Sequence, residues 1–191
     1  MSKVSPIAMT VRVVLVVSIL IPLGAFAHPI PDIPVRSFFD SDGGATIQVE
    51  VDPRCFAPDP LNEPYLVTAA LQSMEVEEKA QLFSRTKGFI ARLITLRTAP
   101  GGPLQPAFDL RFTAFGDEEL TAGSPDSTPV VITAECKIDA SDWEEYQVAS
   151  GKEMPFSVQV INVVKGERQP LNVLFPGEES QVLDLQDGLR D

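Results

Sequence analysis

Residues 45–56 read ATIQVEVDPRCF, and this stretch decides the fold class. Branched apolar side chains at Ile47, Val49 and Val51 alternate with polar ones, which predicts a β-strand with one face in the core. Asp52-Pro53 ends this strand, because proline has no N–H to donate to a neighbouring strand. The pattern therefore predicts a half-buried strand that runs into a proline-rich loop.

Similar patterns recur along most of the chain. Turn signals separate most of them, and Asp42-Gly43 is a strong hairpin signal because glycine accepts a positive φ. The pattern predicts a mainly β fold, an antiparallel immunoglobulin-like sandwich, with a partly open barrel as the alternative. The further strands are expected at residues 35–40, 93–98, 108–113, 130–138, 143–149, 154–164, 171–175 and 181–185.

One α-helix is predicted as an insertion around residues 73–92. Ser73 is placed to cap it, and glutamates follow in its first turns, where the helix dipole favours anions. Its apolar residues fall near one face, which is expected to pack on a sheet, with a partner-binding groove as the alternative. These residues are Val76, Ala80, Phe83, Ile90 and Ile94.

Residues 1–27 have the features of a signal peptide. Lys3 and Arg12 give a basic start, residues 13–23 form an apolar run, and Ala25-Phe26-Ala27 is an A-x-A cleavage site. The run is much shorter than the roughly 20 residues that cross a bilayer, so a retained anchor is the weaker interpretation. Residues 28–191 are then expected to form one exported domain, periplasmic or extracellular, without a membrane span.

The chain is acidic, with 27 Asp and Glu against 15 Lys and Arg, and a formal net charge of -12. Such a field repels nucleic acid and anionic lipid, so no nucleic-acid partner is expected. It could attract a cation or a basic partner, and residues 116–128 form an acidic loop. An acidic surface that keeps an exported protein soluble is the simpler explanation.

The chain has two cysteines, Cys55 and Cys136. In an oxidising compartment such a pair most simply forms one disulfide, and the alternation in residues 130–138 points Cys136 inward. A redox-active pair and two unpaired thiols are the alternatives. Catalytic dithiols are usually two residues apart, so a structural disulfide between Cys55 and Cys136 is expected.

The sequence contains no recognisable catalytic motif. His28 is the only histidine, which removes Ser-His-Asp and Cys-His schemes, and there is no G-x-S-x-G, H-E-x-x-H or glycine-rich phosphate loop. A two-carboxylate glycosidase stays open, because its acidic pair is recognised only in space. We expect a non-enzymatic protein.

His28 supports one sharper hypothesis. Cleavage after Ala27 would give it a free amine beside its own imidazole, a pair of nitrogen ligands for copper or nickel. This start resembles that of periplasmic copper-binding sandwiches and histidine-brace oxygenases. Those families use a further histidine, which this chain lacks, so carboxylates would have to complete the site.

A second resemblance rests on the signal peptide, the His-first mature end and residues 175–180, FPGEES. These features resemble the exported N-terminal region of HupE/UreJ-type membrane proteins associated with hydrogenase and urease. The resemblance implies an exported accessory sandwich, working beside a membrane protein encoded separately. The expected function is a non-enzymatic binding or assembly module for an unknown protein or small ligand; the alternative is a periplasmic copper- or nickel-binding protein.

Overall fold

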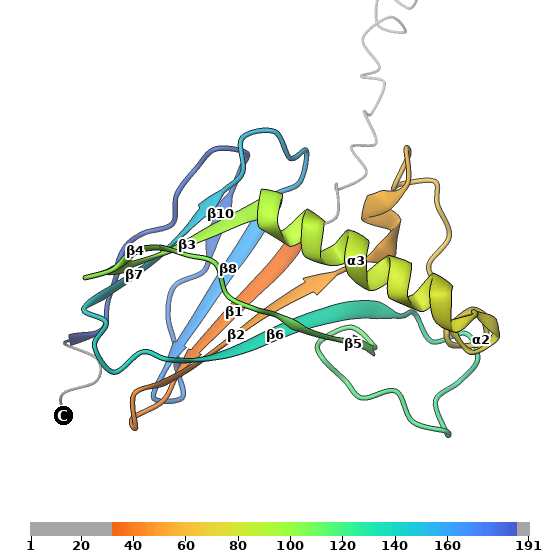
Figure 1. The fold of residues 1–191 in the computed structure, drawn as a ribbon, viewed down its shortest axis with the longest axis horizontal. Coiled ribbons are helices and arrows are strands. Elements are labelled where there is room, and N and C mark those ends of the chain that lie inside the picture. The colour runs from red at the N-terminus through yellow and green to blue at the C-terminus, as the bar shows by residue number, and fades with distance from the viewer. Residues whose placement is uncertain (1–31, 187–191) are drawn as a thin grey trace, which may run out of the picture.

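The computed structural model describes residues 32–186, which form two β-sheets and one long helix (Figure 1). The larger sheet contains β1 (Ile33–Phe39), β2 (Gly44–Val51), β5 (Asp109–Thr113), β6 (Val131–Asp139), β8 (Val158–Val164), β9 (Glu167–Arg168) and β10 (Asn172–Leu174). The smaller sheet contains β3 (Ile94–Ala99), β4 (Gly102–Leu104), β7 (Glu145–Ser150) and β11 (Leu183–Asp184). This confirms the mainly β, sandwich-like expectation.

The strand order of the larger sheet is β10-β8-β1-β2-β6-β5, with β9 paired to β8, and that of the smaller sheet is β11-β7-β3-β4. Val35 of β1 lies opposite Val49 of β2 in an antiparallel pair and opposite Val160 of β8 in a parallel pair. The expectation of a wholly antiparallel sandwich was therefore wrong. The parallel pair is possible because the chain visits the smaller sheet between β1 and β8, which supplies the long crossover that parallel strands need.

The core contains the side chains that the alternating pattern placed there. Ile47, Val49 and Val51 of β2 are fully buried, as predicted. The two sheets also meet through Tyr146 of β7, whose ring lies edge-on to Phe39 of β1 with ring centroids 5.1 Å apart. Burial of these apolar and aromatic faces supplies the main driving force for the two-layer arrangement.

The predicted helix is two helices, α2 (Thr68–Ser73) and α3 (Val76–Leu93). α3 begins with a capping box, in which the backbone N–H of Glu75 donates to Glu78 at 2.9 Å, so the expected cap at Ser73 was wrong. The helix packs against the larger sheet, where Phe83 stacks on Phe112 of β5 with ring centroids 4.7 Å apart. The prediction that its apolar face packs inward is confirmed for Phe83 and Ile90, whereas Val76 is 74% exposed and was wrongly assigned to that face.

β3 begins directly where α3 ends, as the change of period at residue 93 predicted. Gly151, just after β7, donates its N–H to the carbonyl oxygen of Leu93 at 2.7 Å. A Cβ at Gly151 would lie 1.9 Å from the carbonyl oxygen of Arg92, so only glycine fits. This close approach fixes the end of α3 against the smaller sheet.

Between residues 32 and 186, no helix has both the length and the apolar character needed to cross a membrane.

Candidate binding site

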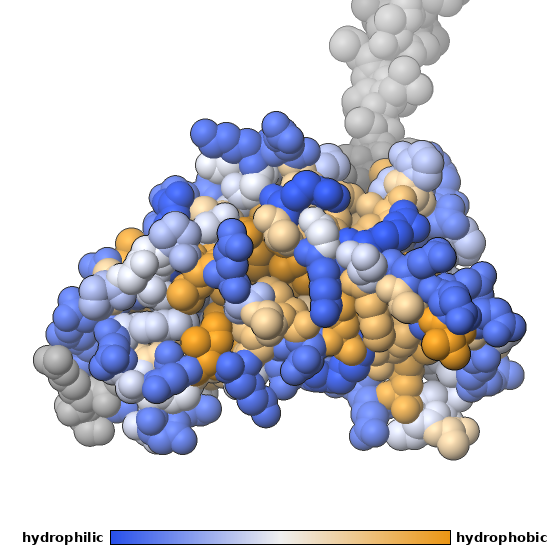
Figure 2. All heavy atoms as spheres, viewed as in Figure 1, coloured by the Kyte–Doolittle hydropathy of each residue, from blue (hydrophilic) through white to orange (hydrophobic). Residues whose placement is uncertain are grey.

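A pocket of about 480 Å³ lies where the chain passes from the smaller sheet to the larger one. Residues 105–108 make this crossover from β4 to β5, and they run beside α3 (Figure 1). Figure 2 shows apolar surface along the flank of α3 that faces the crossover. The apolar walls come from α3, β3, β4 and the crossover, and consist of Ile90, Ala91, Ile94, Leu96, Leu104 and Phe108.

Local sequence explains why the pocket stays open at this edge. Alternation along β3 turns Ile94 and Leu96 inward, where they are almost fully buried. Pro106, just after β4, has no N–H to donate, so the crossover cannot continue β4 as a regular paired strand. The crossover therefore leaves the smaller sheet early and bounds the pocket instead of closing the sandwich over it.

The rim of the pocket is polar. Lys87, Thr95 and Gln105 line it and are exposed to solvent. Lys87 has no ion-pair partner within the described part of the chain. A concave, mainly apolar site of roughly 300–1,000 Å³ with a few polar groups is typical of small-molecule binding. The arrangement can hold an apolar body inside and a polar or anionic end at the rim.

The prediction of a disulfide between Cys55 and Cys136 was wrong, because both are free, buried thiols. Cys136 lies opposite Ile47 in the β2–β6 pair, whereas Cys55 follows the far end of β2 in the short helix η2 (Pro53–Phe56). Val51, the last residue of β2, is four residue steps beyond Ile47, about 13 Å at the usual rise per residue. The predicted inward direction of Cys136 is confirmed, since it is 5% exposed.

Burial also determines the chemistry of the two thiols. It raises the pKa of Cys55 to about 12 and the pKa of Cys136 to about 11. Both therefore stay protonated near neutral pH, and the thiolate is the reactive form of cysteine. The two cysteines are core residues here, and neither lines the pocket described above.

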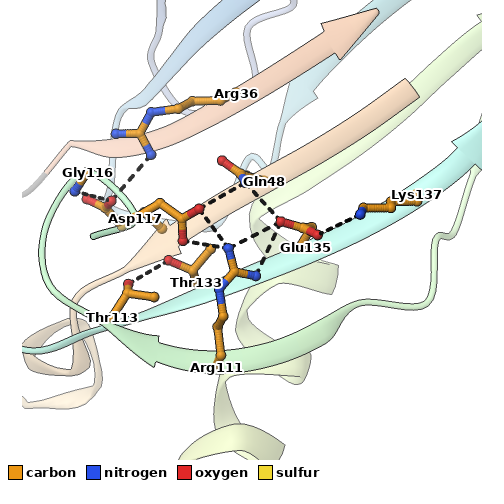
Figure 3. A network of polar contacts seen from close by, with 10 residues as sticks. Arg36, Gln48, Arg111, Thr113, Gly116, Asp117, Thr133, Glu135 and Lys137 are labelled. Atoms are coloured by element: carbon orange, nitrogen blue, oxygen red, sulfur yellow. Dashed lines mark hydrogen bonds and ion pairs between the residues drawn. The ribbon is translucent and has the colours of Figure 1, made fainter. Parts of the chain in front are cut away.

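A network of charged side chains lies on the outer face of the larger sheet (Figure 3). The Glu50 carboxylate, which is 5% exposed, accepts from the Arg36 guanidinium at 3.3 Å and from the backbone N–H of Gly116 at 2.8 Å. Arg111 donates to both carboxylate oxygens of Asp117, at 2.6 and 2.7 Å. These contacts hold the loop that follows β5 against β2 and β6.

Glu135 lies at the centre of the same network. It accepts from Gln48 at 2.9 Å and from Arg111 at 3.2 Å, and these hydrogen bonds and the nearby cation lower its pKa. Asp117 has a φ of 66°, a conformation uncommon for a residue with a side chain, and its paired contact with Arg111 holds it there. The carboxylates are paired with cations, so the network positions a loop and does not resemble a poised acid and base.

The other residues singled out from the sequence are not brought to the pocket. The FPGEES segment forms a turn after β10, in which the N–H of Glu178 donates to the carbonyl oxygen of Phe175 at 3.0 Å. Within residues 32–186, no three His, Cys, Asp or Glu side chains are grouped closely enough to hold a metal ion. His28 lies outside the described residues, so the copper or nickel site stays a prediction.

Sequence reasoning did not single out Lys87, Leu104 or Gln105 as site residues. The available signal was Pro106, just before the strand predicted at residues 108–113, because proline does not continue a paired strand. No known protein family matches this chain, and no curated protein is recognisably similar to it.

Proposed function

We propose that this chain is an exported, non-enzymatic binding module that holds a small apolar or amphiphilic molecule in the pocket beside α3. The pocket between α3 and the β4–β5 crossover is the observation that carries the proposal. Its inner wall is formed by core side chains, among them Ile90 and Leu96, so a ligand there would extend the core of the sandwich. Each Å² of apolar ligand surface removed from water would contribute about 25 cal/mol to the free energy of binding. The translational and rotational freedom lost on association offsets part of this gain.

The polar rim supports an amphiphilic ligand over a purely apolar one. Lys87 offers an ammonium group that has no ion-pair partner among residues 32–186, and Gln105 and Thr95 offer hydrogen-bonding groups at the same opening. A ligand with one polar or anionic end could therefore keep that end at the rim while its body lies between Ile94 and Leu104. Specific polar groups of this kind fix the orientation of a ligand more than they add affinity.

Binding is favoured over catalysis by the state of the described reactive groups. Burial raises the pKa of Cys55, Cys136 and Tyr146, which keeps all three protonated near neutral pH. The carboxylates of the outer network, Glu50 and Glu135, accept hydrogen bonds from cationic side chains. An activated nucleophile or a free acid–base pair would need the opposite arrangement.

Export and an accessory role form part of the same proposal. The signal features of residues 1–27 support secretion, and two buried, protonated thiols are protected from oxidation even outside the cytoplasm. The immunoglobulin-like connectivity and the likeness to HupE/UreJ-type proteins also stay proposals, supported by the two-sheet architecture and by the FPGEES segment. Intact mass of secreted protein would give the position of cleavage.

The pocket is tested by filling it. Ala91 is an exposed alanine of α3 that lines the pocket, and Ala80 is an exposed alanine of the same helix that does not. We expect the neutral apolar dye Nile red to bind the unmodified protein with an increase in fluorescence. Ala91→Trp should abolish this increase and Ala80→Trp should retain it. An equal effect of the two substitutions, or no binding by the unmodified protein, would contradict the proposal.

A further inference from the structure

A second cleft, of about 590 Å³, lies on the opposite flank of α3. One wall is a face of the helix that includes Arg85, Gly88 and Arg92. The facing walls are residues 55–58 and Pro60, which follow β2, and residues 154–156, which precede β8. At 100° per residue these helix positions point about 140° away from Lys87, Ile90 and Ala91, so α3 separates this cleft from the apolar pocket.

The floor of the cleft is aromatic. Phe89 of α3 meets Phe56 edge-to-face with ring centroids 5.6 Å apart, and meets Phe156 edge-to-face at 5.5 Å. Phe89 and Phe156 are almost fully buried, and Phe56 is half-buried. The three rings therefore form a rigid apolar surface on which a planar or apolar group could pack.

Two arginines stand over this floor. The Arg85 guanidinium donates to the carbonyl oxygen of Phe56 at 2.9 Å and lies 4.8 Å from the centre of the Phe56 ring, which orients it and leaves other N–H donors unused. Arg92, two turns further along the helix, is exposed and has no ion-pair partner within residues 32–186. Both guanidiniums are thus available to an anion.

The charge of this cleft is opposite to that of the whole chain. The protein carries a net charge of -12, yet no acidic side chain of the described residues lines the cleft. Cys55 is part of its wall, and burial raises the pKa of that thiol to about 12, so it adds no negative charge. Asp52 lies near Cys55 and adds to that rise in pKa, but its carboxylate is paired with Arg54 at 2.7 Å. The guanidiniums of Arg85 and Arg92 therefore leave a positive charge at the cleft, which favours an anionic ligand.

Gly88 keeps the space between the two arginines open. A Cβ at this position would meet no atom within 4 Å, so packing does not require glycine here. Glycine within a helix costs roughly 1 kcal/mol relative to alanine. A bulky residue at this position would instead stand between Arg85 and Arg92 and narrow the cleft.

We propose that this cleft binds a small organic carboxylate with an aromatic or apolar body, the body packing on Phe56, Phe89 and Phe156 and the carboxylate bound by Arg85 and Arg92. The planar guanidinium fork matches a carboxylate with two parallel hydrogen bonds, which a lysine cannot provide. This site is separate from the apolar pocket, so a ligand can bind here whether or not the apolar pocket binds one.

The test is a calorimetric titration of the folded protein with 2-naphthoate, and with neutral 2-naphthamide of the same shape, at low ionic strength. We expect measurable binding of the carboxylate and much weaker binding of the amide. Arg92→Gln should weaken naphthoate binding about tenfold, the scale of a lost charge-assisted contact. Lys87→Gln, which removes the same charge from the other flank of α3, should leave it within about twofold.

A second measurement locates the ligand directly. The backbone amides of Gly88 and Phe89 should shift in an NMR titration of the unmodified protein with 2-naphthoate, and Ala91→Trp should leave these shifts intact. Equal binding of the acid and the amide, equal losses in Arg92→Gln and Lys87→Gln, or no binding would overturn the proposal. Binding of an acidic peptide but not of 2-naphthoate would also overturn it, in favour of a protein partner.

Discussion

The hydroxyl groups of Ser37 and Tyr146 lie 2.9 Å apart and join the two sheets through the core. Ser37 belongs to β1 of the larger sheet, Tyr146 to β7 of the smaller one, and both side chains are almost fully buried. Neither hydroxyl would find water if the other were removed. This buried polar contact therefore helps to fix how the two sheets face each other.

Tyr146→Phe should lower the free energy of unfolding by about 1–3 kcal/mol, because it leaves the Ser37 hydroxyl buried without its partner. Urea denaturation of Tyr146→Phe, of Ser37→Ala and of the double variant measures the free energy of unfolding in each case. The double variant should lose less than the sum of the single losses. Strict additivity would show that the two hydroxyls do not interact.

Because its two thiols are buried, we expect the protein to lose free energy of unfolding in alkali. Their folded pKa values are raised to about 12 and about 11, from an ordinary value of 9.0. The unfolded chain thus releases these protons first, so stability is fully present below about pH 9 and declines as pH rises toward the folded pKa values. Unfolding in urea at about pH 8 and about pH 10 should show a smaller decline in Cys55→Ala/Cys136→Ala. An unchanged pH dependence in that variant would contradict the burial of the thiols.

Two glycines give opposite predictions for the same substitution. Gly151→Ala should destabilise the protein by about 1–3 kcal/mol or more, because its Cβ would collide with the Arg92 carbonyl oxygen. Gly88→Ala should stabilise it by about 0.5–1 kcal/mol, since the added methyl group meets open space and favours the helix. Thermal unfolding of the two variants compares them directly, and similar shifts of both midpoints would refute the packing at Gly151.

Because Glu135 is hydrogen-bonded and paired with a cation, we expect the protein to lose free energy of unfolding in acid. The hydrogen bond from Gln48, and then Arg111, lower its pKa from an ordinary value of 4.5. The stabilisation is therefore present above about pH 4.5 and is lost as pH falls through the lower folded value. Glu135→Gln should unfold with a weaker pH dependence between about pH 5 and about pH 3 than the unmodified chain does. The same steep dependence in both proteins would place the acid-sensitive group elsewhere.

Much of the strand pattern could be predicted from alternation alone, and the reason is visible in β2. Ile47, Val49 and Val51 had to share a buried face because successive side chains point to opposite sides of a strand. Glu50 on the other face is buried as well, because the loop after β5 folds back over it. That contact joins residues far apart in the sequence and leaves no local signal.

The parallel pairing of β1 with β8 and the separation of the two cysteines could not be predicted for a related reason. Both depend on strand order, whereas periodicity reports only which face of a strand is buried. The inward direction of Cys136 was predicted correctly. Its register opposite Ile47 was needed to show that Cys55 is too far away to form a disulfide with it. The binding pocket likewise arises from a crossover between sheets, of which the sequence shows only the prolines.

Binding of an apolar ligand in the pocket beside α3 can be observed by NMR of side-chain methyl groups during titration with 1-decanol. We expect concentration-dependent shifts for the methyl groups of Ile90, Ile94, Leu96 and Leu104, which line the pocket. Unchanged signals from these residues, or shifts confined to exposed Leu171 and Val173 in and beside β10, would contradict it.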